Sequence, residues 1–173
     1  PGDTVPADVS MLSITGDYEV IYLPGTYGTG SAVTDMKPHN NILTLRGALF
    51  TRAGYTQVGW STVDGGEKVY GFEDIYTKNE ALTLYPVWNT NKYTITFDTN
   101  GGSEIAPITQ DYGTEITAPD NPTRKGYTFK GWDKEIPETM PAENITVKAQ
   151  WEINQYTITF DTNGGSEIAP ITQ

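Results

Sequence analysis

Residues 93–110 read YTITFDTNGGSEIAPITQ, and residues 156–173 repeat the same eighteen letters after a period of 63 residues (156 − 93 = 63). Apolar side chains alternate with polar ones from Tyr93 to Phe97, the period of two that is typical of a strand with one buried face. Asn100-Gly101-Gly102 follows, and these residue types tolerate the positive φ angles of a tight hairpin turn. The stretch therefore predicts a β-hairpin that opens a repeated folding unit.

A weaker copy of this unit lies earlier in the chain. The run RAGY before Trp60 matches the run RKGY before Trp132, with five residues from Tyr to Trp in both cases. Residues 82–88 and 145–151 also overlay, and each segment ends in Trp. The sequence therefore predicts tandem modules: a leader at 1–17, a divergent module at 18–91, a compact module at 92–154 and, at 155–173, the opening hairpin of a truncated third repeat.

Alternation predicts further strands in the compact module. Residues 145–151 place Val147 and Trp151 on one apolar face, and shorter strands are expected at 105–109 and 115–117. Between the strands expected at 115–117 and 145–151, residues 120–126 read DNPTRKG. This run offers a cap, a Pro suited to the first helical position and a terminating Gly, which predicts about one helical turn.

Two local features distinguish the first module. Pro86 falls inside its last expected strand, which predicts an edge strand because proline cannot donate to a ladder. The interval from Trp60 to Leu82 is nine residues longer than its counterpart in the second module (21 against 12). The insertion predicts an extra hairpin around residues 64–66, which read DGG.

Composition supports a mostly β protein and excludes several functions. Aromatic residues make up 12% of the 173 residues and favour pleated sheets, while 18 glycines and 11 prolines divide the chain into pieces too short for long helices. The net charge of -11 disfavours nucleic acid as a partner, because phosphate binding needs clustered Lys and Arg. No apolar run approaches the roughly 20 residues that cross a bilayer. With no cysteine, disulfides, thiolate catalysis and Cys-ligated metals are excluded.

The compartment stays open on composition alone. The chain begins Pro1-Gly2-Asp3-Thr4, without the charged and apolar regions of a signal peptide. We therefore expect a soluble chain that is either intracellular or cut from a longer precursor. A β-rich chain without cysteine suits the cytosol or a bacterial surface.

Three ordered blocks carry a resemblance to a known family: YTITFDTNGG from Tyr93, RKGYTFKGW from Arg124 and MPAENITVKAQW from Met140. Together they resemble the Listeria-Bacteroides repeat, the B-repeat of internalin-type surface proteins, over residues 93–152 and more loosely over 18–88. The resemblance implies an α+β, mostly β fold of tandem small β-grasp-like modules with a minimal helix. It also implies secreted, extracellular bacterial proteins near the cell wall, and it brings no catalytic residues.

The charged residues and the histidine that could bind a metal or act in catalysis are better explained as turn or surface residues. Residues 98–104 begin like a calcium loop, but Gly102 stands at the fifth position and Thr109 at the twelfth, so a hairpin turn is predicted. His39 is the only histidine and lacks marked partners for a triad or a metal, so we expect an exposed loop residue. Four carboxylates could in principle do acid–base work, but 22 acidic residues produce such pairs by chance, and a solvated face is expected. These four are Glu104, Asp111, Glu115 and Glu143.

Two short motifs also have simpler interpretations. LPGTY at 23–27 nearly matches a sortase signal, but Tyr27 replaces the final Gly and no apolar tail follows, so a turn is predicted. Asn144-Ile145-Thr146 is a formal glycosylation acceptor that we interpret as strand sequence. We predict no catalytic, metal or cofactor site, and no ligand-binding residue is assigned.

The tryptophans could be sugar-stacking platforms or core anchors. Their equivalent positions in the two modules favour core anchors, one set per module: Trp60, Trp88, Trp132 and Trp151. Tyr85 is opposite in phase to Trp88 and is the better candidate for an exposed ring.

These patterns predict a non-enzymatic, extracellular bacterial repeat array that acts as stalk or spacer and adhesion module of a cell-surface protein. The alternative is a module that binds a glycan or a host protein through exposed aromatics and sheet edges. Expected partners are a host protein or glycan and neighbouring repeats of the same chain, without nucleic acid or membrane insertion. The hairpin at 156–173 has an unpaired edge, and we expect it to pack on the preceding module or to swap into another chain.

Overall fold

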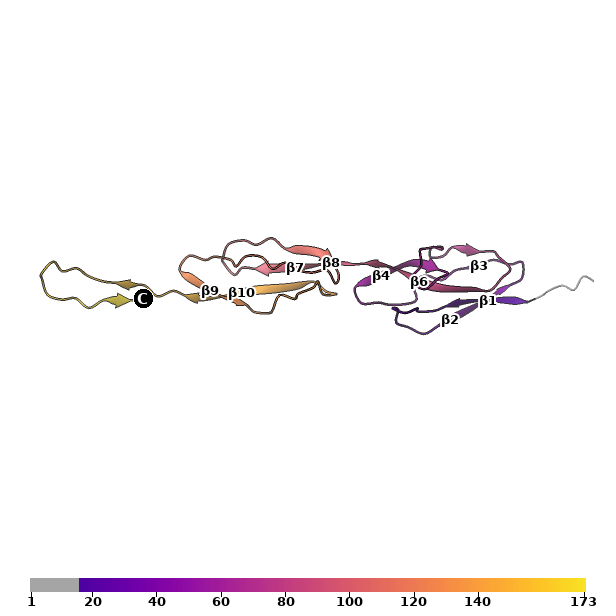
Figure 1. The fold of residues 1–173 in the computed structure, drawn as a ribbon, viewed down its shortest axis with the longest axis horizontal. Helices are drawn as coiled ribbons and strands as arrows, with labels where there is room; N and C mark the ends of the chain where they lie inside the picture. Colours follow the sequence, from indigo (N-terminus) through magenta and orange to yellow (C-terminus); the bar gives the residue numbers. More distant parts are fainter. Residues whose placement is uncertain (1–15) are drawn as a thin grey trace, which may run out of the picture. The chain divides into compact units, whose positions relative to one another are not determined.

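The computed structural model describes residues 16–173, which form strands and loops and contain no helix (Figure 1). They divide into two compact units, one ending at Asn89 and one running from Thr90 to Gln173. Residues 1–15 of the expected leader lie outside the described residues, and the four-part division stays a prediction. The strands are β1 (Asp17–Tyr22), β2 (Val33–Pro38), β3 (Leu43–Thr44), β4 (Tyr55–Ser61), β5 (Ile75–Tyr76), β6 (Leu82–Thr90), β7 (Lys92–Asp98), β8 (Ile108–Asp111), β9 (Tyr127–Trp132), β10 (Ile145–Ile153), β11 (Thr157–Ile158) and β12 (Ile171–Thr172).

Each unit contains a four-stranded sheet, and the two sheets have equivalent strand orders. Module one, β1–β6, has the order β2-β1-β6-β4, and module two, β7–β10, has the order β8-β7-β10-β9. In both modules the first strand runs antiparallel to the second and parallel to the last. Separate two-stranded sheets are formed by β3 with β5 and by β11 with β12. The mostly β prediction is confirmed, and the β-grasp likeness stays a prediction.

The helical turn expected at 120–126 is wrong, because these residues run as a loop that ends in a turn. Two hydrogen bonds join Ser103 to the backbone of Thr123. The Ser103 N–H donates to the Thr123 carbonyl oxygen at 2.7 Å, and the Thr123 N–H donates to Ser103 Oγ at 2.9 Å. Pro122 also disfavours the α conformation of the residue before it. The described residues therefore lack the helical part of the expected α+β fold.

The edge strand expected at Pro86 is also wrong, because β6 lies between β1 and β4. The ladder of β1 with β6 ends at the pair of Tyr22 and Leu84, after which the Leu23 N–H donates to the Leu84 carbonyl oxygen at 2.9 Å. Pro86 comes after the last residue that pairs with β1. Its missing N–H therefore removes no hydrogen bond from that ladder.

The hairpin predicted from residues 93–110 is confirmed as the antiparallel pair β7 and β8, with Ile95 opposite Ile108. Asn100 and Gly101, with φ angles of 49° and 86°, form the tight turn that the sequence predicts. This turn begins a loop that spans 99–107 instead of joining the strands directly. The second strand therefore starts at Ile108, later than expected.

Two other short elements predicted from the sequence are present in reduced form. In the insertion of module one, the Gly66 N–H donates to the Val63 carbonyl oxygen at 2.9 Å, and Trp60 bridges Tyr70. The extra hairpin predicted around residues 64–66 is therefore present as a turn closed by a single bridge. The strand expected at 115–117 is reduced to one bridge between Glu115 and Thr139.

Each module has its own apolar core. Trp60 is fully buried in module one, where its ring lies against Tyr22 and Phe50. In module two, Val147 and Ala149 are buried on the face that alternation predicts. The core prediction is confirmed for Trp60, while Trp88 and Trp132 are half-buried and pack against the two cores, and Trp151 is half-buried.

Candidate functional site

Both modules contain the same arginine–tyrosine turn in front of a strand. In module one the Arg52 guanidinium lies 3.6 Å from the ring centre of Tyr55, and in module two Arg124 lies 3.8 Å from Tyr127. Each turn is closed by the tyrosine N–H, which donates to the arginine carbonyl oxygen at 3.1 Å. The RAGY and RKGY runs therefore build a local stack of cation on ring.

The surface beside this stack is filled in module two. Trp151 Nε1 donates to the Thr99 carbonyl oxygen at 3.0 Å, and Gly102 lies against the indole ring. Arg124 Nη1 donates to the Asn100 carbonyl oxygen at 3.2 Å. The loop that follows β7 thus covers the tryptophan and engages the arginine.

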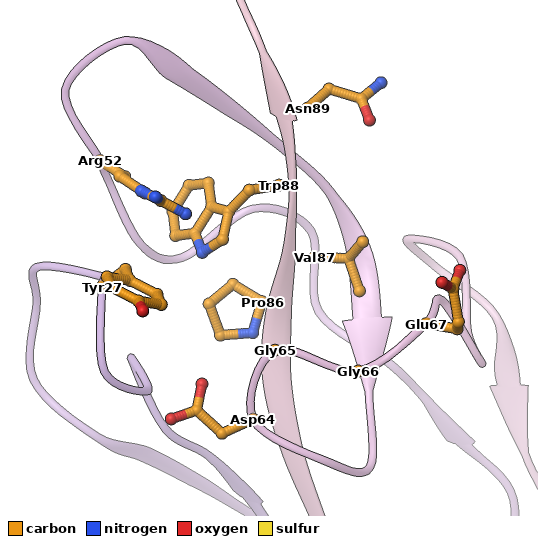
Figure 2. A pocket seen from close by; sticks show the side chains of 10 residues that line it. All are labelled: Tyr27, Arg52, Asp64, Gly65, Gly66, Glu67, Pro86, Val87, Trp88 and Asn89. Carbon is orange, nitrogen blue, oxygen red and sulfur yellow. The ribbon is translucent and has the colours of Figure 1, made fainter. Parts of the chain in front are cut away.

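The corresponding surface of module one is an open pocket of about 420 Å³ (Figure 2). Here the loop after β1 carries Tyr27, whose ring is 61% exposed. The Arg52 guanidinium lies 4.5 Å from the ring centre of Tyr27 as well as on Tyr55, so two rings flank it. The pocket is lined by Tyr27, Arg52, Asp64, Gly65, Gly66, Glu67, Pro86, Val87, Trp88 and Asn89.

Asp64 fixes the shape of the pocket by joining two loops. Its Oδ2 accepts hydrogen bonds from the N–H of Thr26 at 2.8 Å and from Thr26 Oγ1 at 2.7 Å. Gly25 lies against the Asp64 carboxylate with a φ of 66°, where a side chain would both strain the backbone and collide with the carboxylate. The insertion of module one therefore positions Tyr27, thirty-seven residues earlier in the chain (64 − 27 = 37).

Strand β6 provides the floor of the pocket. Pro86 and Trp88 point to the side that holds Tyr27, Arg52 and Asp64, as alternation along a strand requires (Figure 2). Among residues 16–173, no protein group accepts a hydrogen bond from Nε1 of Trp88 or of Trp132, whereas Trp60 and Trp151 both have an acceptor. The site therefore offers an indole donor that the fold does not use.

Sequence reasoning did not single out Tyr27, Arg52 and Asp64 as a site. The RAGY run, the LPGTY run and the DGG insertion were each visible, but no spacing rule places these three segments together. The LPGTY turn is confirmed, with the Gly28 N–H donating to the Pro24 carbonyl oxygen at 3.1 Å. Tyr85, the ring expected to be exposed, is half-buried instead.

The other sequence candidates hold loops and strands together. Asp98 accepts a hydrogen bond from the Asn100 N–H at 2.9 Å, which lowers the pKa of Asp98 and confirms the turn interpretation. His39 is half-buried, not exposed, and its Nδ1 lies 2.9 Å from the Tyr18 hydroxyl. Asn144 Oδ1 accepts the Thr94 N–H at 2.9 Å just before β10.

The carboxylate candidates are spread over the surface. Asp111 pairs with Lys92 at 3.0 Å, while Glu104, Glu115 and Glu143 are exposed. Within the described part of the chain, no three acidic or histidine side chains gather closely enough to hold a metal ion. Nor does that part contain a helix long and apolar enough to span a membrane.

Two modules of equivalent strand order, each with its own core, define a tandem-repeat β protein. The chain belongs to the Listeria-Bacteroides repeat domain family, whose model matches residues 18–87 and 93–150. The resemblance seen in the sequence is thereby confirmed for both modules.

Similar proteins come from bacteria. The chain is 39% identical over 128 residues to a putative Gly-rich membrane protein of Evansella cellulosilytica, a match that covers 68% of this chain and 15% of that protein. It is 36% identical over 128 residues to a putative membrane protein of the same bacterium, covering 69% and 19%. It is 36% identical over 113 residues to internalin H of Listeria monocytogenes, covering 60% and 20%. The chain therefore spans no more than 20% of the length of these relatives.

Proposed function

We propose that this chain is a non-enzymatic spacer and adhesion segment of a secreted bacterial surface protein, located outside the cell near the wall. The observation that carries the proposal is the family membership of both modules, with relatives named as an internalin and as membrane proteins. Each relative is at least five times longer than the matched part. A short repeated segment within a long protein is consistent with a spacer that connects other domains.

The connection between the modules supports the spacer role. Strand β6 ends at Thr90 and β7 begins at Lys92, so one residue, Asn91, separates the two strands. A flexible linker extends under load because it has slack, and a single residue provides almost none. Lengthening the connection between the two modules beyond this one residue therefore requires a module to unfold.

The sheet topology supports resistance to such stretching. In module two the first strand, β7, lies parallel to the last strand, β10, with Ile95 opposite Ile145 and Asp98 opposite Lys148. A pull on the two ends of a module slides these strands along each other, so the hydrogen bonds of the ladder are loaded together. In module one, β1 and β6 are paired in the same parallel way. Both modules thus have the strand arrangement that a load-bearing spacer needs.

Two experiments test this proposal. In the native bacterium, protease added to intact cells should remove the segment from the surface; a segment that stays protected until the cells are lysed would contradict the location. In single-molecule pulling of the chain through its ends, each module should unfold in one step that releases about 20 nm of chain. Smooth extension at low force, without such steps, would exclude the spacer role.

A second proposal concerns the terminal hairpin, residues 156–173. Ile158 and Phe160 are 59% and 42% exposed, whereas the identical residues of β7, Ile95 and Phe97, are 0% and 6% exposed in the core of module two. Exposed apolar side chains next to an unpaired strand edge favour association. We propose that the terminal hairpin binds a second copy of this chain by taking the place of β7 and β8 in its module two.

A further inference from the structure

We infer that the pocket of module one binds a neutral saccharide, with a hexopyranose ring against the aromatic side chains and its hydroxyl groups on Arg52, Asp64 and Trp88. This inference rests on the adhesive part of the proposed function, and it names the ligand class and the residues. The spacer role does not depend on it.

Aromatic surface at the pocket matches the apolar face of a sugar. A pyranose ring presents a flat face of C–H groups, which an exposed aromatic ring covers without losing hydrogen bonds. Tyr27 is 61% exposed, and the half-buried ring of Trp88 stands above Pro86 (Figure 2). The pocket volume of about 420 Å³ lies within the range of small-molecule sites.

Polar groups around the rings match sugar hydroxyls. A hydroxyl both donates and accepts, so neighbouring hydroxyls are best bound by donors and acceptors placed together. In the described residues Arg52 forms no ion pair, so its N–H groups are available at the edge of the two rings. Asp64 uses Oδ2 for both bonds to Thr26, and its Oδ1, which lies against Gly25, accepts no hydrogen bond from the described residues. Trp88 Nε1 adds a third group, a donor.

The charges of the pocket favour a neutral sugar over an acidic one. Arg52 and Asp64 face the same space and carry opposite charges, so their sum is zero (Figure 2). Glu67 lines the pocket from the other side of β6, and the whole chain carries a net charge of -11. A sulfated or carboxylated saccharide would approach a surface of its own sign.

Module two shows that the fold does not require this pocket. There the matching tryptophan, Trp151, is covered by Gly102 and bonded to Thr99. The pocket of module one comes from its own loop at 24–28 and from its insertion, two segments in which the modules differ. Both modules contain the stack of arginine on tyrosine. The feature specific to module one is the open pocket through which a ligand can reach that stack.

The test is an NMR titration of the isotope-labelled full chain with two neutral probes and one acidic control. Chitotriose represents wall-type glycans, lactose represents animal-cell glycans, and a heparin disaccharide is the control. A neutral glycan array widens the search. We expect at least one neutral glycan to shift amide signals at 25–28, 52, 63–66 and 86–89, and the heparin disaccharide to leave them in place. Which probe binds identifies the source of the sugar.

Variants make the assignment specific. Tyr27→Ala should weaken binding at least about tenfold, as expected for an aromatic contact residue. Tyr156→Ala is the matched control, because that ring is 62% exposed and lies in the terminal hairpin; its affinity should equal that of the unmodified chain. Arg52→Lys should also weaken binding, because Lys lacks the planar fork. Unchanged thermal unfolding of each variant excludes misfolding.

Three results would overturn the inference: no neutral glycan binds on the array or in the titration, the shifted signals surround Trp151 instead of Trp88, or Tyr27→Ala binds as well as the unmodified chain. Each leaves the surface-protease and pulling experiments untouched, so failure of the saccharide site is distinguishable from failure of the spacer proposal.

Discussion

Trp151 donates a hydrogen bond of 3.0 Å from its indole Nε1 to the carbonyl oxygen of Thr99. This bond ties the last strand of module two to the loop that follows its first strand, and it closes that loop over the ring. In module one the loop folds toward Asp64 instead, and Trp88 is left at an open surface. The same tryptophan position thus closes one module and lines a pocket in the other.

Gly102→Ala should destabilise module two by about 1–3 kcal/mol, the usual cost of adding an atom to a filled contact. A Cβ at Gly102 would lie 2.5 Å from Trp151 Cζ2 and 3.2 Å from the Thr123 carbonyl oxygen. The ring cannot move away without loosening its bond to Thr99. Urea unfolding followed by tryptophan fluorescence measures the effect.

Gly165→Ala is the matched control, because residue 165 occupies the identical position in the terminal hairpin. No tryptophan lies beside it, and an added Cβ would meet only Thr162, with its carbonyl oxygen at 3.2 Å. The free energy of unfolding should change by less than about 0.5 kcal/mol. Equal losses in the two variants would mean that the Trp151 contact is unimportant.

The sequence predicted those elements whose signals are local. Alternation over 145–151 and the Asn100-Gly101 turn follow from backbone and side-chain preferences of neighbouring residues, and both are present. The helical turn at 120–126 failed because the competing bonds come from Ser103, about twenty residues away. The edge position of Pro86 failed because strand order is set by the whole sheet.

The candidate site was harder to predict than the fold. Tyr27, Arg52, Asp64 and Trp88 come from four segments, and their meeting depends on the Asp64 bonds to Thr26. No periodicity links residues so placed. The signal that could have directed attention there is the difference between the modules, because the insertion and the changed loop fall in one of them.

Asn79→Ala should destabilise module one by about 1–3 kcal/mol, because it leaves a buried charge with fewer partners and removes both hydrogen bonds between Asn79 and Asn40. Lys37 is fully buried, and its Nζ donates to Asn79 Oδ1 at 3.0 Å and to the Pro38 carbonyl oxygen at 3.4 Å. In a Lys37→Met background the same Asn79→Ala change should cost less, since the charge is gone. Chemical unfolding of the two single variants and the double variant measures this coupling. Additive losses would show that Asn79 does not act through Lys37.

Asp35→Asn should reduce the acid sensitivity of module one. Arg46 donates to both carboxylate oxygens of Asp35, from Nε at 2.8 Å and from Nη2 at 2.6 Å, and these hydrogen bonds lower the pKa of Asp35. A carboxyl group whose pKa is lower in the folded state stabilises that state above its ordinary pKa, near 4. The stabilisation is lost as the pH falls below about 4 and through the folded value.

Thermal unfolding between neutral pH and about pH 2 measures this difference. Asp35→Asn should be less stable than the unmodified chain at neutral pH, and the two should converge in acid. Asp17→Asn serves as control, because Asp17 is exposed and has no ion pair among the described residues. If Asp35→Asn and the unmodified chain kept a constant difference at every pH, the carboxylate would not be the source of the acid sensitivity.

The exchange of the terminal hairpin between chains gives a prediction of residue-to-residue contact. In module two Thr96 lies opposite Thr146 in the parallel pair of β7 and β10, and both are exposed. Thr159 is the counterpart of Thr96 in the terminal hairpin (96 + 63 = 159). If the hairpin of one chain replaces β7 of another, Thr159 must lie opposite Thr146 of that second chain. Because the chain contains no cysteine, a cysteine introduced at either position is the only thiol in its chain.

A mixture of Thr159→Cys and Thr146→Cys chains should therefore form a disulfide-linked heterodimer under mild oxidation, since strand-paired residues lie within the Cα separation that a disulfide spans. A mixture of Thr159→Cys with Thr114→Cys provides the control, because Thr114 is exposed and outside the strands.

Deletion of 156–173 should also remove any concentration-dependent oligomer in analytical ultracentrifugation. Equal disulfide yields in the two mixtures would mean random collision between exposed thiols, and a hairpin that packs on its own chain would leave the Thr159→Cys and Thr146→Cys mixture monomeric. Either result contradicts exchange, whereas a heterodimer confined to the register-matched pair can arise only if the copied hairpin occupies the place of β7.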